Sequence, residues 1–231
     1  NKLTKLSTQK DEFLSHVSHE LRTPMTSIRS FSEILQSNKE LEKDQLKYFS
    51  TIINDESKRL TRLLDEILDL SFLESGQVKL NISKIELNNV LEIALQSTQQ
   101  TISISNAILE TNIDLTKTEI QTDADRLSQV FINLITNAIK YNDKNQPLIE
   151  INCEKINNKL CITFQDNGPG IPKAERAIIF EKFTKLSSTE NSSGVGLGLA
   201  ISKEIMKNLG GSLLCLESKA GAKFQVQIPL N

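Results

Sequence analysis

The first 75 residues contain one proline and no glycine, a composition that favours long, uninterrupted helices in this part of the chain. Apolar residues at helical spacing form one continuous face from Phe13 to Leu35, and a second such run extends from Phe49 to Leu70. A polar stretch, residues 36–44, separates the two runs. We therefore expect two long helices joined by a short turn and packed as an antiparallel hairpin.

A lone hairpin of this kind leaves part of each apolar face in contact with water. Pairing with a second copy of the chain, as a four-helix bundle, would bury the remainder. The alternative is that the apolar face packs against the rest of the same chain. We favour the homodimer, held together through this N-terminal hairpin.

The composition changes at residues 75–76, after which short β-like runs alternate irregularly with helical patterns. The expected strands are 107–113, 148–156, 159–165, 212–217 and 223–228, and the expected helices are 91–100, 124–141 and 197–209. The pair Asn157-Asn158 suits a tight hairpin turn. We predict an α+β chain with two domains, the hairpin at 1–77 and an α/β sandwich at 78–231, whose mixed sheet is covered by helices on one face.

Composition argues against several classes of protein. A net charge of −2 argues against a nucleic-acid binder, which carries a concentrated basic surplus. Three cysteines without CxxC spacing favour neither a disulfide framework nor a zinc site, so we expect reduced thiols and a cytoplasmic location.

No run approaches the roughly 18 apolar residues of a membrane span, so we expect no membrane contact within these residues. No signal peptide is visible, and the sequence opens inside a helical pattern. We therefore expect an upstream segment, which is compatible with a membrane-anchored full-length protein.

His19 lies on the side of the first helix that the apolar residues avoid. At about 100° per residue, the apolar positions centre near 45° and His19 falls near 240°, so we expect it to face solvent. Glu20 follows directly, Thr23 lies one turn on, and Pro24 interrupts the helical hydrogen bonds and should bend the helix. From periodicity alone, an incidental surface histidine is an equal alternative.

The neighbours of His19 suit a phosphoacceptor. An imidazole that donates one ring proton to a carboxylate becomes more nucleophilic at its other nitrogen, and Glu20 is the candidate carboxylate. Thr23 could instead position a water molecule against a phosphoryl group. His16 is followed by Val17 rather than an acid, so we give it a structural role.

The sequence lacks the GxxxxGK[ST] loop, yet three other segments suit a nucleotide. On the expected helix 124–141, Asn133 and Asn137 share a face, and amide oxygens suit Mg²⁺. Lys140 offers charge to phosphate, and Tyr141 offers a flat surface to a base. By itself, this pattern also fits a helix with polar edge residues.

The other two segments are rich in glycine. Asp166 opens a DNGPG turn directly after a strand, where a carboxylate can accept from an exocyclic amine, although a simple turn is an equal alternative. The loop 192–198 leads into a helix, whose free N–H groups attract phosphates. The polar stretch 187–193 before it has few apolar anchors and is predicted to be a mobile lid.

These segments together resemble a known family. The motifs are SHELRTP at 18–24, NLITNAIKYN at 133–142, DNGPGI at 166–171, FEKF at 180–183 and GVGLGLA at 194–200. In order and spacing they resemble the five motifs of sensor histidine kinases, over about residues 8–230. The resemblance implies a dimerisation and histidine-phosphotransfer hairpin, followed by a Bergerat-type ATP-binding domain like that of gyrase, MutL and the Hsp-type chaperones.

The resemblance also implies roles for residues of the hairpin and of the FEKF motif. His19 matches the phosphorylated histidine, and Glu20 matches the acid that assists it. Thr23 matches the residue that supports dephosphorylation of a partner response regulator. Phe180 and Phe183 match an aromatic pair that helps the lid and the hairpin to meet.

Further roles are implied in the ATP-binding domain. Asn137 matches the Mg²⁺ ligand, with Asn133 one turn before it. Lys140 matches a phosphate contact, Tyr141 a residue lining the adenine site, and Asp166 the acid that reads the adenine amino group. The remaining matches are the loop glycines and a basic γ-phosphate contact: Gly168, Gly170, Gly194, Gly196, Gly198 and Lys185.

The chain departs from the family pattern at three positions. Val195 replaces a common Thr and keeps its backbone amide, and Asn142 stands where a small hydroxyl residue is common. Lys185 replaces the more usual Arg, which weakens the assignment of that contact. None of these changes argues against the binding of ATP.

The expected function is autophosphorylation of His19 with Mg-ATP, followed by transfer to an aspartate of a separate response regulator, whose dephosphorylation the protein also supports. An ATP-driven machine of the gyrase class would not need the His-Glu-x-x-Thr pattern. A purely binding dimer would not need His19, Glu20, Asn137 and Asp166 together. A protein that acts chiefly as a phosphatase keeps the same residues and stays open.

Overall fold

The computed structural model describes residues 2–37, 41–112, 118–185 and 195–230. The chain divides into two compact units, Asn1–Asp69 and Leu70–Asn231. Among the described residues, no helix is both long and apolar enough to cross a membrane. The domain boundary that we expect at residues 77–78 stays a prediction.

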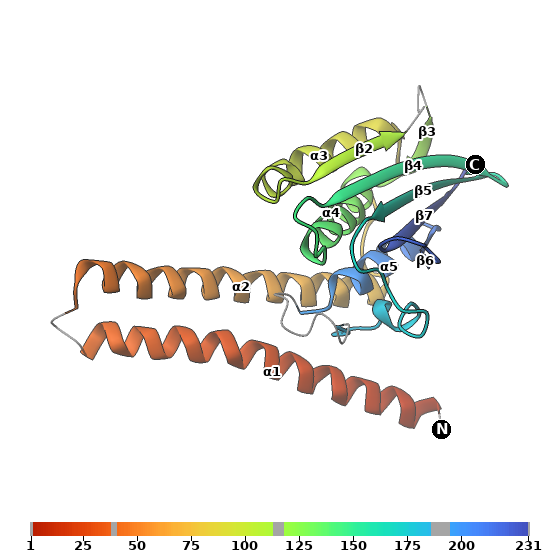
Figure 1. Cartoon of the computed structure of the whole chain (residues 1–231). Helices are drawn as coiled ribbons and strands as arrows, with labels where there is room; N and C mark the ends of the chain where they lie inside the picture. Colours follow the sequence, from red (N-terminus) through yellow and green to blue (C-terminus); the bar gives the residue numbers. More distant parts are fainter. Residues whose placement is uncertain (1, 38–40, 113–117, 186–194, 231) are drawn as a thin grey trace. The chain divides into compact units, whose positions relative to one another are not determined.

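The first unit is formed by α1 (Lys2–Ser37) and most of α2 (Lys43–Ser75), which lie side by side and antiparallel (Figure 1). The predicted helical hairpin is therefore confirmed. The rings of Phe31 and Phe49 stack across the two helices with their centroids 5.4 Å apart. The helix α1 continues through Pro24, whose missing N–H removes one helical hydrogen bond just after His19.

The hairpin leaves several large apolar side chains in contact with solvent. Met25 on α1 is 57% exposed, and Leu64 and Leu68 on α2 are 43% and 54% exposed. Side chains of this kind are normally covered when they gather on one surface. The pattern is the one expected of a helix pair that packs against a further partner.

The second unit contains a mixed five-stranded sheet of order β2-β4-β5-β7-β6. The strands are β2 (Ile108–Asn112), β4 (Leu148–Ile156), β5 (Lys159–Asp166), β6 (Ser212–Leu216) and β7 (Lys223–Pro229). Only the pairing of β2 with β4 is parallel among the described strands of this sheet. The turn between β4 and β5 has positive φ at Asn157 and Asn158, as the predicted tight hairpin requires.

Helices cover one face of this sheet. The helix α4 (Ala124–Lys140) contacts β4 and β5, α5 (Gly198–Asn208) contacts β6, and α3 (Leu87–Ile104) packs against α4 (Figure 1). The rings of Phe131 on α4 and Phe164 on β5 lie 5.2 Å apart in the core between the layers. The predicted α/β sandwich with a one-sided helical layer is confirmed.

Two short strands were not predicted. The strands β1 (Ser83–Glu86) and β3 (Glu119–Thr122) form a separate antiparallel pair. Each has only four residues; β1 is mostly exposed, and β3 alternates exposed and buried residues over a run too short to be recognised as a strand. The helix α3 also begins at Leu87 and ends at Ile104, beyond the predicted 91–100 at both ends.

The start of α4 is fixed by Asp123. Its Oδ1 accepts from the backbone N–H of Arg126 at 3.1 Å, which caps the helix, and its Oδ2 accepts from the N–H of Asn81 at 2.8 Å. The first bond sets the position of α4, and the second ties the incoming chain to it. The residues that α4 carries are thereby held at a defined place beside the sheet.

The three cysteines, Cys153, Cys161 and Cys215, are free thiols, as the sequence predicts. Burial raises the pKa of Cys153 to about 11. A thiol of this kind is protonated at neutral pH and is a poor nucleophile.

Candidate functional site

A pocket opens in the second unit between α4, the turn after β5, the segment at Thr184 and Lys185, and the start of α5. Its wall includes five of the residues predicted from the sequence: Asn137, Tyr141, Asp166, Gly170 and Lys185. Three segments far apart in the sequence therefore meet at one hollow. The pocket wall is mainly apolar away from these residues, which suits the burial of a flat ring.

Asp166 lies at the end of β5 and is held by two backbone amides. Its Oδ1 accepts from the N–H of Gly168 at 2.8 Å and from the N–H of Ala222 at 3.0 Å. Within the described part of the chain, its Oδ2 has no hydrogen-bond partner. The carboxylate is thus fixed in orientation and keeps one acceptor atom for a ligand.

Burial raises the pKa of Asp166, and the two amide hydrogen bonds oppose this by favouring the ionised form. Burial is the larger of the two effects. A carboxyl group that is partly desolvated gains more from a ligand donor than an exposed group does, because it has lost its water. The site is therefore prepared for a donor such as an exocyclic amine.

Gly221 supports Asp166 and was missed by the sequence analysis. It has φ +68°, and a Cβ atom at this position would overlap the backbone carbonyl and Oδ1 of Asp166. The glycine thus lets the turn between β6 and β7 approach closely enough for Ala222 to donate to Asp166. The only sequence signal is a glycine inside a hairpin turn, which is common in any sheet protein.

Asn137 and Asn133 are linked on α4. The side-chain amide of Asn137 donates to Oδ1 of Asn133 at 3.3 Å, and the amide of Asn133 donates to Oγ of Ser202 on α5 at 2.9 Å. This chain of donors turns Oδ1 of Asn137 away from Asn133 and leaves it available as a ligand. Asn133 itself is not part of the pocket wall and acts as the link between α4 and α5.

Gly198, the first residue of α5, allows this link to form. A Cβ atom at residue 198 would overlap Oδ1 of Asn133. The glycine is therefore needed for the close approach of α5 to α4, in addition to whatever its backbone contributes to a ligand.

Lys140 and Tyr141 form a pair at the end of α4. Nζ of Lys140 donates to the hydroxyl of Tyr141 at 3.1 Å and lies 4.7 Å from the centre of its ring. Tyr141 contributes to the pocket wall, whereas Lys140 is exposed and is not part of that wall. The lysine therefore lies next to a wall residue without lining the pocket itself.

The FEKF motif lies beside the same pocket. The ring of Phe180 packs edge-to-face against Phe224, a wall residue, at 6.3 Å. Phe183 has φ +60°, and its N–H donates to the carbonyl of Gly196 at 3.0 Å. A Cβ atom at Gly196 would crowd the backbone of Phe183 and Thr184, so this glycine is required where the two segments cross.

Gly194 and the expected lid, residues 187–193, lie outside the described residues. Lys185, the last described residue before them, contributes to the pocket wall together with Thr184.

The remaining wall residues were missed from the sequence because they are apolar. They are Ala138, Pro169, Ile171, Ile179, Leu199, Ala222 and Phe224. Such residues follow the same patterns as a core, and nothing local distinguishes a pocket wall from a packed interior. Four of them, Ala138, Pro169, Ile171 and Leu199, lie inside the quoted motifs, and this was the one available signal.

The second group of predicted residues lies on α1. His19 is exposed, as its position on the helical wheel predicts, and Thr23 is exposed one turn later. The hydroxyl of Thr23 donates a long bond of 3.4 Å to the carbonyl of His19, whereas that of Thr26 donates at 2.8 Å to Arg22. Thr23 therefore has a weakly held hydroxyl on the face that carries His19.

Comparison with known families assigns both units. The model of the His Kinase A (phospho-acceptor) domain matches residues 9–76, and that of the histidine kinase-, DNA gyrase B- and HSP90-like ATPase matches residues 122–231. The chain belongs to the sensor histidine kinases of two-component systems. The resemblance read from the five motifs is confirmed.

Individual proteins that resemble this chain are also histidine kinases. The sensor protein kinase WalK of Staphylococcus saprophyticus is 32% identical over 209 residues, which are 89% of this chain and 34% of WalK. The Acinetobacter baumannii histidine kinase AdeS has a TM-score of 0.74 at 25% identity, covering 92% of this chain and 98% of that one. The histidine kinase ThkA, solved in complex with the response regulator protein TrrA, has a TM-score of 0.76 at 26% identity, covering 100% and 66%. The chain thus spans about a third of the length of this WalK relative.

Proposed function

We propose that this histidine kinase phosphorylates itself on His19 with Mg-ATP and passes the phosphoryl group to an aspartate of a response regulator. The observation that carries the proposal is the pocket in which Asn137 and Asp166 meet, in a chain whose other unit presents an exposed His19. ThkA, a relative in fold, was solved with a response regulator, and this supports the same kind of partner here.

The donor atoms of the pocket fit the nucleotide and its metal. Oδ2 of Asp166 would accept from the adenine amino group, and Tyr141 would lie against the base. Oδ1 of Asn137 is a neutral oxygen donor of the kind that Mg²⁺ accepts alongside water. When bound, Mg²⁺ would neutralise charge on the phosphates.

The positive groups would act at the phosphates. Lys140 and Lys185 would contact phosphate oxygens, and the backbone amides around Gly196 and Gly198 at the start of α5 would add donors. The resemblance extends this loop to Gly194 and the turn after β5 to Gly168 and Gly170. Phe180 and Phe183 would help the loop and the hairpin to meet.

The proposed reaction transfers the γ-phosphoryl group of ATP to His19. One ring nitrogen attacks the γ-phosphorus while the bond to the β–γ bridging oxygen breaks, and ADP leaves. The proton on the other ring nitrogen is shared with the carboxylate of Glu20, which keeps the attacking nitrogen electron-rich. Positioning and charge stabilisation supply most of the rate.

The exposed apolar residues of the hairpin support a homodimer as the active form. Met25, Leu64 and Leu68 would be covered by a second copy in a four-helix bundle. A single hairpin in solution would leave them in water.

The decisive test is labelling with γ-labelled ATP and Mg²⁺. The chain has two histidines, so His16→Gln is a matched control for His19→Gln. We expect acid-labile, alkali-stable label on the wild type and on His16→Gln, and none on His19→Gln. Label that persists in His19→Gln, or that is stable to acid, would refute the assignment.

A further inference from the structure

An arginine, Arg59, faces the segment around His19 from the opposite helix of the hairpin. Nη2 of Arg59 on α2 lies 3.7 Å from Oε2 of Glu20 on α1, the residue that directly follows His19. Glu20 is a half-buried side chain, whereas His19 is exposed. The two neighbours thus project differently, and Glu20 is the one that reaches towards α2.

Arg59 is shared with a second carboxylate on its own helix. Its Nη1 lies 3.6 Å from Oε2 of Glu56, one turn earlier on α2. This Oε2 is buried and has no hydrogen-bond partner within the described residues. A buried carboxylate oxygen without a hydrogen bond costs free energy, and a nearby positive charge offsets part of that cost. Glu56 therefore favours a position of the Arg59 guanidinium near the helix interface.

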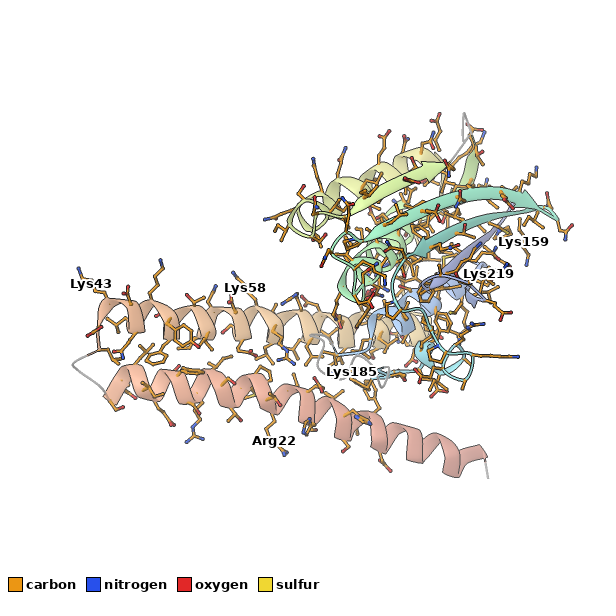
Figure 2. The ribbon with its side chains drawn as sticks, in the orientation of Figure 1. Arg22, Lys43, Lys58, Lys159, Lys185 and Lys219 are labelled. Atoms are coloured by element: carbon orange, nitrogen blue, oxygen red, sulfur yellow. The ribbon has the colours of Figure 1, made fainter. Side chains whose placement is uncertain are left out.

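Two neighbouring cations project away from this interface. Lys58, directly before Arg59, and Arg22, two residues after Glu20, each point away from the opposite helix (Figure 2). Arg59 is therefore distinguished from these two cations by its direction, and it has two carboxylate partners.

From this geometry we infer that Arg59 is a positioning residue for autophosphorylation, acting through Glu20. Its pairing with Oε2 of Glu20 fixes one oxygen of the carboxylate and leaves Oε1 to accept from the imidazole of His19. Glu56 shares the positive charge, so Arg59 orients Glu20 without binding it as tightly as a bidentate pair would. This inference rests on the proposed function of His19 and adds a residue that the five motifs do not include.

The role predicts a specific kinetic pattern. Arg59→Gln should lower kcat for autophosphorylation by about tenfold and leave the KM for ATP unchanged, because the lost contact orients the histidine and touches no nucleotide. Arg59→Lys should recover part of this loss. Arg62→Gln is the matched control, since Arg62 lies one turn on, is exposed, and bonds only weakly to Lys58 of its own helix at 3.4 Å.

A double-mutant cycle separates action through Glu20 from any other role. If Arg59 acts through Glu20, the variant Glu20→Gln/Arg59→Gln is no slower than Glu20→Gln alone. If the double variant lost activity by the product of the two single-variant losses, or if Arg59→Gln raised the KM for ATP, the inference would be overturned. Thermal unfolding and the oligomeric state of each variant identify misfolding, and in that case the Arg59→Lys comparison decides.

A second readout needs no kinase activity, so it remains decisive if the labelling test fails. Nitrogen NMR of the two histidine side chains reports their tautomers, and His16→Gln identifies the signals of His19. Arg59→Gln and Glu20→Gln should shift the tautomer populations of His19 in the same direction, while Arg62→Gln should not. An unchanged His19 spectrum in Arg59→Gln would refute the positioning role.

Discussion

The side-chain amide of Asn137 donates a hydrogen bond of 3.3 Å to Oδ1 of Asn133, and the side-chain amide of Asn133 donates to Oγ of Ser202 at 2.9 Å. Because both amides act as donors along this chain, the oxygen of Asn137 is directed away from it. The residue proposed to hold Mg²⁺ is thus oriented by a residue that does not line the pocket. The helix α5 takes part through Ser202, so the orientation depends on two helices that are distant in sequence.

This relationship predicts that Asn133→Ala weakens Mg²⁺ dependence without removing a ligand. The concentration of Mg²⁺ needed for half-maximal ATP binding should rise by about tenfold, which is typical when a group that orients a metal ligand is lost. Asn137→Ala should abolish the Mg²⁺ dependence, and Ser202→Ala should have a smaller effect in the same direction. Titration of each variant with Mg²⁺ at fixed fluorescent ATP analogue measures this, and an Asn133→Ala curve equal to the wild type would contradict it.

Gly221 predicts a second, structural effect on the pocket. Gly221→Ala should cost about 2–5 kcal/mol, the sum of a left-handed backbone and of overpacking against Asp166. Gly210→Ala is the matched control, because it has φ +75° but nothing within 4 Å of the added atom. It should cost only about 1–2 kcal/mol.

Chemical unfolding of both glycine variants gives these values, and ATP titration gives the functional consequence. The affinity for ATP should fall in Gly221→Ala and stay unchanged in Gly210→Ala. Equal destabilisation of the two variants would mean that the close approach to Asp166 is not limiting.

The resemblance implies that Thr23 supports dephosphorylation of a response regulator, and this role predicts that one substitution separates that activity from autophosphorylation. Thr23→Ala should slow dephosphorylation of a phosphorylated receiver domain by about tenfold or more, because a positioned hydroxyl that orders water is lost. Autophosphorylation should stay within about twofold, since such transfer depends on positioning at His19 and the ATP site. Thr26→Ala is the control, because its hydroxyl bonds to the helix at 2.8 Å and is engaged there. Equal phosphatase rates in both variants would assign the activity elsewhere.

The parts of the fold that follow a long period were predictable from the sequence. The hairpin and α4 were found because apolar residues recur at helical spacing over many turns. The strands β1 and β3 were missed because a run of four residues is too short for a period of two to be recognised. The ends of α3 were missed for a related reason, since tertiary contacts extend a helix past its strongest pattern.

The residues of the candidate site also divide into those that the sequence predicted and those that it did not. Asp166 and Asn137 were found because they carry polar chemistry at a spacing that a ligand needs. Gly221 and Arg59 were missed because their effects depend on what lies across from them in space, on another hairpin turn or another helix. A sequence shows the chemistry that a side chain can perform, whereas the fold shows which other residues that side chain contacts.

Asp166 predicts opposite effects on stability and on binding. Its pKa is raised by burial, so the folded protein binds the proton more tightly than the unfolded chain does. As pH rises from the ordinary range of an Asp carboxyl through this raised value, the unfolded chain loses the proton first, and stability without ligand falls. Asp166→Asn carries no charge to desolvate and can keep both amide bonds through its oxygen.

The variant should therefore lose less stability between mildly acidic and neutral pH than the wild type, and be at least as stable at neutral pH. Its affinity for ATP should drop by about tenfold or more, because a side-chain amide would present a donor to the adenine amino group. Calorimetric unfolding across this pH range, with exposed Asp143→Asn as the control, measures the first effect, and ATP titration measures the second. A variant that is less stable than the wild type at neutral pH would show that the amide bonds, and not burial, dominate at Asp166.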